Sequence, residues 1–199
     1  TPDSTPLALF WSASRRALPT ALTLVPICVL LGILAARMQW SALEVLLFSV
    51  LGFSGSGQFA LLPLAAQGFD LLAMLVIAVS INSRYLPIAF VSAAKLPRPL
   101  LQRASLAHML GDEAYALEHE TDGHAQRWGV RLTIYLTWVA ATVGGALLAG
   151  VLPAAWFDHG LNLGFPASVV LLILSLNQLK ARVPHIRAGW ARRGLELVL

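Results

Sequence analysis

The stretch "LLAMLVIAVSINSRYLPIAFVSAA", residues 71–94, decides the fold class of this chain. It is almost continuously apolar, and as a helix it would extend for about 36 Å, more than the roughly 30 Å of a bilayer's hydrocarbon core. Its one charged residue, Arg84, is fourteenth in the run and so lies about 2 Å from its middle. A guanidinium at that depth cannot reach the interface, so it must face the protein interior and find a partner there.

The composition of the whole chain agrees with this interpretation. Of its 199 residues, 57% are hydrophobic and 12% are charged, about half the charged share of a soluble domain. We therefore predict an all-α, polytopic integral membrane helical bundle, with residues 1–199 forming one transmembrane domain in a lipid bilayer. The net charge of +4 does not indicate a nucleic-acid partner, because the basic residues gather at segment ends, where they orient a membrane protein.

About five segments are predicted to lie in the membrane. The segment at 42–67 is interrupted by "GFSGSGQ" at 52–58, and this glycine-serine run is a poor helix interior. Each flank has about ten residues and covers about half the hydrocarbon thickness. The sequence leaves two alternatives open, one kinked span or two half-helices of a re-entrant segment. The continuous segments are 17–36, 71–94, 128–151 and 161–179, between tails at 1–16 and 181–199.

The loop charges predict the orientation of the segments. Twelve Lys and Arg residues lie outside the spans, and the basic loop 93–127 and the C-terminal tail are expected in the cytoplasm. If 42–67 crosses, the N-terminus is outside and the basic residues divide ten inside to two outside. If 42–67 is re-entrant, the N-terminus is inside and the division is eleven to one. In both cases the run 71–94 passes from outside to inside.

The neighbours of Arg84 indicate a candidate anion site. On a straight helix Ser80, Ser83, Arg84 and Pro87 share one face, while Asn82 points roughly the other way. Pro87 lacks an N–H group, which leaves the carbonyl of Ser83 without its helical donor. A cation, two hydroxyls and a carbonyl at membrane depth suit the carboxylate and ammonium of an α-amino acid. The alternative is a structural ion pair between helices.

The glycine-serine break offers a second set of candidate groups. A half-helix starting there would point its N–H groups at the membrane centre, and such discontinuous helices build anion sites in transporters. Ser54, Ser56 and Gln58 would line this site. An intramembrane serine hydrolase is an alternative, but a nucleophile needs a base within reach. The histidines, at 108, 119, 124, 159 and 185, all lie in loops or tails.

Two acidic residues stand out in "HMLGDEAYALEHE", residues 108–120. Apolar residues recur at helical spacing there, which predicts an amphipathic helix within the 93–127 loop. Asp112 and Glu113 either face solvent, or one of them enters the bundle, pairs with Arg84 or carries a coupling proton. His108 lies one turn before Asp112, but two ligands without a third do not predict a metal site, and no cofactor is expected. The apolar residues are Leu106, Leu110, Ala114 and Leu117.

Three motifs in order resemble the AzlC-type permeases over roughly residues 17–180. They are "G-x-x-Q-F-A" at Gly55–Ala60, "N-x-R-Y-L" at Asn82–Leu86 and "D-E-x-Y-A-L" at Asp112–Leu117. The resemblance implies the large subunit of a branched-chain amino acid exporter in the bacterial cytoplasmic membrane, driven by the proton-motive force. It also implies a small, hydrophobic AzlD-like partner subunit, and self-association into a homo-oligomer stays open.

The predicted roles combine the residues with this resemblance. Arg84 would hold the substrate carboxylate, and Asn82 with freed carbonyls would take the ammonium. Such permeases usually continue with further hydrophobic segments where this chain has a basic tail, so a non-transporting accessory subunit is the alternative function. The predicted substrate site comprises Arg84, Asn82, Ser80, Ser83, Ser54, Ser56 and Gln58, with Asp112 or Glu113 as the coupling or gating group.

Overall fold

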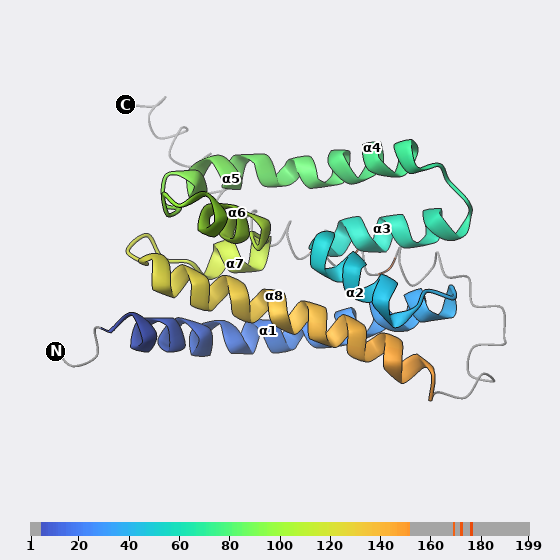
Figure 1. Cartoon of the computed structure of the whole chain (residues 1–199), viewed down its shortest axis with the longest axis horizontal. Coiled ribbons are helices and arrows are strands. Elements are labelled where there is room, and N and C mark those ends of the chain that lie inside the picture. Colours follow the sequence, from blue (N-terminus) through green and yellow to red (C-terminus); the bar gives the residue numbers. More distant parts are fainter. Residues whose placement is uncertain (1–4, 152–168, 170–171, 173–175, 177–199) are drawn as a thin grey trace, which may run out of the picture.

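The computed structural model describes residues 5–151 and the single residues 169, 172 and 176. Every regular element of the described residues is a helix, which confirms the predicted all-α class (Figure 1). The predicted segment 161–179 falls almost wholly outside the described residues. The elements are α1 (Pro6–Arg37), α2 (Ala42–Leu51), α3 (Gly55–Ala66), α4 (Leu71–Asn82), the 3-10 turn η1 (Ser83–Tyr85), α5 (Leu86–Ala93), α6 (Leu100–His108), α7 (Asp112–Leu117) and α8 (His124–Ala149).

Three helical segments are long and apolar enough to cross a membrane: Pro6–Arg37, Leu71–Ala93 and His124–Ala149. The first begins well before the predicted residue 17, because the Thr5 hydroxyl caps it by accepting a hydrogen bond from the N–H of Ala8. Most of the predicted N-terminal tail is therefore helical.

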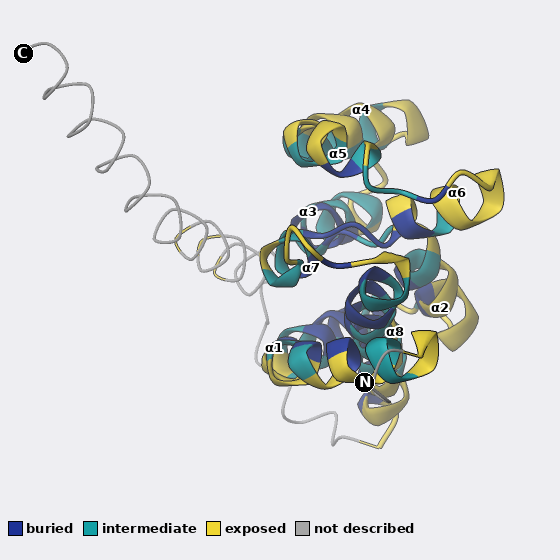
Figure 2. Cartoon of the chain, turned by 90° about the vertical axis from the view of Figure 1, so that its left-hand side faces the viewer, coloured by how far each residue is buried: buried dark blue, intermediate teal, exposed yellow. Residues whose placement is uncertain are grey.

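Helices α1 and α8 pack against each other along one edge of the molecule and run parallel (Figure 1). The Ser14 hydroxyl donates to the carbonyl of Gly129 near one end, and Gly32 lies against Thr142 further along. Glycine is required at this contact, because a Cβ atom on Gly32 would stand 1.9 Å from the Thr142 carbonyl oxygen. Small residues allow such close approach in membrane helix pairs. The interior between the two helices is buried (Figure 2).

Helices α2 and α3 settle the alternative that the sequence left open. Their 10 and 12 residues correspond to about 15 and 18 Å, too short for either to cross. In Figure 1, α3 returns to the side of the molecule from which α2 entered. The segment 42–67 is therefore a re-entrant hairpin with its tip at residues 52–54.

Helices α6 and α7 form a second hairpin, which enters from the opposite side (Figure 1). The apolar pattern from which one amphipathic helix was predicted within the 93–127 loop is divided between two helices, because α6 ends at His108 and α7 begins after Gly111. The apolar residues of that pattern are nevertheless mostly buried. The two hairpin tips meet, because a ring nitrogen of His108 lies 2.6 Å from the carbonyl oxygen of Val50 at the end of α2.

A buried charge cluster fastens the second hairpin to α8. Arg127 and Arg131 both donate to the carboxylate of Glu118, just after α7. Arg131 also donates to the carbonyl of Leu106 in α6, at 2.6 Å. One fully buried guanidinium thus holds both arms of the hairpin.

Candidate functional site

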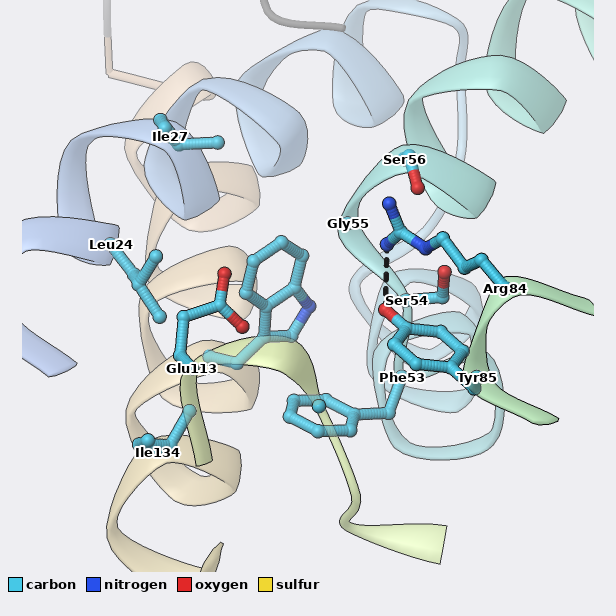
Figure 3. A pocket seen from close by; sticks show the side chains of 12 residues that line it. Leu24, Ile27, Phe53, Ser54, Gly55, Ser56, Arg84, Tyr85, Glu113 and Ile134 are labelled. Carbon is cyan, nitrogen blue, oxygen red and sulfur yellow. Dashed lines mark hydrogen bonds between the residues drawn. The ribbon is translucent and has the colours of Figure 1, made fainter. Parts of the chain in front are cut away.

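A small cavity lies where the two hairpin tips meet the middle parts of α1 and α8 (Figure 3). Its volume is about 30 Å³, room for one or two water molecules. Binding sites for small molecules are usually several hundred Å³, so this conformation is closed around the cavity. The lining residues are Leu24, Ile27, Phe53, Ser54, Gly55, Ser56, Arg84, Tyr85, Gly111, Glu113, Ile134 and Trp138.

Arg84 faces this cavity because the helix tightens around it. In η1 the N–H of Leu86 donates to the carbonyl of Ser83, so the carbonyl that the sequence predicted to be unpaired is satisfied. A 3-10 turn rotates by about 120° per residue instead of 100°, and the predicted shared face is therefore wrong. Ser80 and Ser83 lie exposed on the outside, where the Ser83 hydroxyl donates to the Ser80 carbonyl.

The Arg84 guanidinium has protein partners on one side. One terminal nitrogen donates to the Tyr85 hydroxyl at 2.7 Å (Figure 3) and lies 3.6 Å from a carboxylate oxygen of Asp112. Of the alternatives that the sequence left open for the acids at 112–113, the structure shows the pairing with Arg84, and the acid is Asp112. The Nε atom of Arg84 is buried and has no hydrogen-bond partner among the described residues.

The N-terminus of α3 forms the wall beside this guanidinium. Ser54 caps the helix by accepting from the N–H of Gly57, and its hydroxyl donates to the side-chain oxygen of Asn82 at 2.6 Å. Ser56 is 8% exposed, and its hydroxyl has no hydrogen-bond partner within the described part of the chain. In Figure 3 this hydroxyl points toward Arg84. The N–H groups of the first helical turn add a partial positive charge.

Gln58 does not reach the cavity, although the sequence predicted it there. Its side-chain nitrogen donates to the carbonyl of Phe48 at 2.7 Å, and its oxygen accepts from the indole N–H of Trp138 at 2.8 Å. It therefore ties the end of α2 to α8. Asn82 also lies off this cavity, bonded to Ser54 on the far side of the hairpin tip.

Glu113 supplies an ionisable group on the opposite wall, next to Leu24 and Ile134 (Figure 3). Burial raises the pKa of its carboxyl above the ordinary value, and the nearby negative charge of Asp112 raises it further.

The arrangement is suited to bind an anion the size of a carboxylate and to exchange a proton beside it. A guanidinium, a buried serine hydroxyl and a helix N-terminus converge on one point. Ser54 gives its proton to a carboxamide, which is not a general base, so the geometry does not favour a serine nucleophile. The described residues contain no group of three or more metal-ligating side chains.

Comparison with known proteins gives the family. The model of the AzlC protein family matches residues 19–152. The chain belongs to the AzlC family. An uncharacterized membrane protein of Archaeoglobus fulgidus is 30% identical over 183 residues, covering 92% of this chain and 80% of that protein. Inner membrane protein YgaZ of Escherichia coli is 25% identical over 181 residues, covering 84% of this chain and 69% of YgaZ. No solved structure matches the chain.

The AzlC-family motifs lie around the cavity, but some of its parts were not predicted from sequence. Tyr85 lies inside the second motif and lines the cavity. No sequence pattern distinguishes a tyrosine with this role from any other tyrosine next to a membrane arginine. Arg131 gave a signal that could have been used: it is a charged residue inside the predicted span 128–151, as Arg84 is inside 71–94. Such a residue requires a buried partner, and that partner is Glu118.

Proposed function

We propose that this chain is the large subunit of a secondary transporter that exports small neutral, branched-chain amino acids. The observation that carries the proposal is the meeting of three groups in a closed cavity: Arg84, the N-terminus of α3, and the Ser56 hydroxyl, which has no hydrogen-bond partner among the described residues. These groups lie in a membrane protein of the AzlC family. The bacterial cytoplasmic membrane is the proposed location, in keeping with the inner-membrane relative YgaZ.

In this proposal the substrate carboxylate binds to the guanidinium of Arg84. It replaces Asp112 and the Tyr85 hydroxyl as acceptors and receives a further hydrogen bond from Ser56. Because Asp112 and Glu113 both lie at the start of α7, displacing Asp112 perturbs the second hairpin and the environment of Glu113 together. Release of a proton by Glu113 would then accompany opening, which couples transport to the proton gradient. The cavity must widen during this step, since it now has room only for water.

The orientation follows from the re-entrant hairpin. With 42–67 entering and leaving on one side and the predicted segment 161–179 crossing, the basic residues outside the spans divide eleven to one, and we propose that the side with eleven is the cytoplasm. The N-terminus, the 93–127 segment and the C-terminal tail are then cytoplasmic. We also propose a small hydrophobic AzlD-like subunit as the partner, and its co-purification with this chain tests that point.

Replacement of Arg84 tests the proposal. The full chain, co-expressed with the small subunit, is reconstituted in liposomes and assayed for counterflow with a panel of labelled amino acids. Arg84→Ala should reduce counterflow of leucine and isoleucine on the order of 30-fold or more, because loss of a buried charged partner costs roughly 2–5 kcal/mol. Arg103→Ala, which removes an exposed arginine from α6, should keep wild-type counterflow.

Two results would contradict the proposal. Full leucine and isoleucine counterflow by the Arg84→Ala protein would remove the carboxylate site. A correctly inserted wild-type complex that moves no amino acid of the panel would favour the accessory-subunit alternative.

A further inference from the structure

A second cavity, which is open to the surface of the molecule, adjoins the first. Its volume is about 250 Å³, and it shares Phe53, Ser54 and Tyr85 with the cavity at Arg84. These three residues therefore form the partition between two adjoining compartments. The second cavity is lined by Leu51, Gly52, Phe53, Ser54, Asn82, Tyr85, Ala89, Ala107, His108 and Leu110.

The polar groups of this second cavity are engaged with the protein itself. Ser54 and Asn82 are hydrogen bonded to each other, and a ring nitrogen of His108 contacts the carbonyl oxygen of Val50. What remains of the wall consists of leucine, alanine and aromatic carbon. The cavity therefore offers an incoming group both polar and apolar surface, with the apolar part supplied by leucine, alanine and phenylalanine side chains, at a size below the roughly 300–1,000 Å³ of sites for drug-sized ligands.

The partition has one fixed part and one part that depends on Arg84. Phe53 is held by edge-to-face contacts with Tyr135 and Trp138, at ring-centroid distances of 5.1 and 6.1 Å. Tyr85 is held by Arg84, which donates to its hydroxyl and lies 4.7 Å from its ring centroid. A carboxylate bound to Arg84 competes with the Tyr85 hydroxyl for the guanidinium, and this loosens the Tyr85 side of the partition.

We propose, resting on the transport function above, that the second cavity receives the aliphatic side chain of the substrate while Arg84 holds its carboxylate. Ala89 on α5 and Ala107 on α6 line this cavity from two different elements. Their methyl side chains leave the space open, so these two alanines set the largest side chain that the transporter accepts. Tyr85 links the two compartments, because the same carboxylate that occupies Arg84 releases it.

Filling the cavity tests this assignment. Ala89→Leu and Ala107→Leu are compared in the reconstituted complex by the ratio of leucine to alanine counterflow. Because a few methylene groups in an apolar pocket change discrimination by about tenfold to a few hundredfold, the ratio should fall at least about tenfold, with alanine counterflow retained. The matched controls are Ala93→Leu on α5 and Ala104→Leu on α6, which line neither cavity; both should keep the wild-type ratio.

A variant that enlarges the cavity distinguishes a change in substrate specificity from damage to the fold. Leu110→Ala removes a buried side chain from the same wall, which enlarges the cavity, and should raise phenylalanine counterflow relative to leucine, a gain that damaged protein would not produce. Unchanged ratios in all three cavity variants, with leucine still transported, would overturn the side-chain assignment and leave the proposed function standing. A wild-type complex that transports no amino acid would overturn the proposed function and this assignment with it.

Discussion

Replacement of Glu118 by glutamine tests how the second hairpin is held in place. Glu118 and Arg127 have side chains that are each 4% exposed, and Arg131 is 0% exposed. The carboxylate accepts from one nitrogen of Arg127 and from two of Arg131. Glutamine has nearly the same size but no charge, and its amide N–H₂ would face a guanidinium that can only donate. Two buried cations would then lack their common anion.

The expected loss is large because all three groups are buried. Removing one member of a buried ion pair costs roughly 3–5 kcal/mol, and for a chain of this size each kcal/mol shifts the midpoint of thermal unfolding by about 2–4 °C. Glu118→Gln should therefore lower the midpoint by roughly 6–20 °C. Because Arg131 also holds the carbonyl of Leu106, the released element should be the hairpin that carries Asp112 and Glu113, and transport should fall with stability.

The assay is thermal unfolding of the purified protein in detergent, followed by the loss of its size-exclusion peak. Glu120→Gln is the matched control, since Glu120 lies in the same segment but pairs with Lys95 on the surface, where its side chain is 83% exposed. Its midpoint should not change measurably. Equal shifts for the two variants would refute the argument that burial of the cluster decides its contribution.

Two further predictions use the same assay. Gly32→Ala should lower the midpoint by roughly 2–12 °C, because its Cβ atom would collide with the Thr142 carbonyl; Gly144→Ala, whose Cβ atom meets nothing within 4 Å, should leave it unchanged or slightly higher. Burial raises the pKa of Glu113 above the 4.5 of an exposed glutamate, so between pH 4.5 and that raised pKa the folded protein binds more protons than the unfolded chain. Wild-type stability should therefore fall as pH rises through this window, and Glu113→Gln should lack that part of the decline.

The membrane fold could be predicted because it depends on length and hydropathy. The run 71–94 is apolar over more than the bilayer thickness, and a helix is the simplest way to satisfy its backbone there. The course of 42–67 could not be predicted, because ten-residue flanks fit both a kinked span and a hairpin. What decides it is packing: α2 lies against α8 and α3 against α4, and no local pattern contains these contacts.

The ion pair at Arg84 could be anticipated from sequence because a charged side chain at membrane depth needs a partner of opposite charge. The depth of Arg84 required a partner, and the acid pair at 112–113 offered one, which the contact with Asp112 bears out. The prediction that Ser80 and Ser83 share the site with Arg84 was wrong for a geometric reason. The predicted face assumes 100° per residue, whereas the chain tightens at Ser83–Tyr85. Ser80 and Ser83 therefore turn outward, and Arg84 is the residue of that predicted face whose side chain lines the cavity.

The hairpin tip explains which polar residues are left for a ligand. Backbone groups at membrane depth must be satisfied by protein when no water reaches them. Gln58 serves the carbonyl of Phe48, and the Tyr135 hydroxyl and His108 both serve the carbonyl of Val50. At this hairpin tip, these three polar side chains are therefore engaged by the backbone. Around the first cavity, the buried Nε of Arg84 and the hydroxyl of Ser56 have no hydrogen-bond partner among the described residues, and these are the groups that we propose for a ligand.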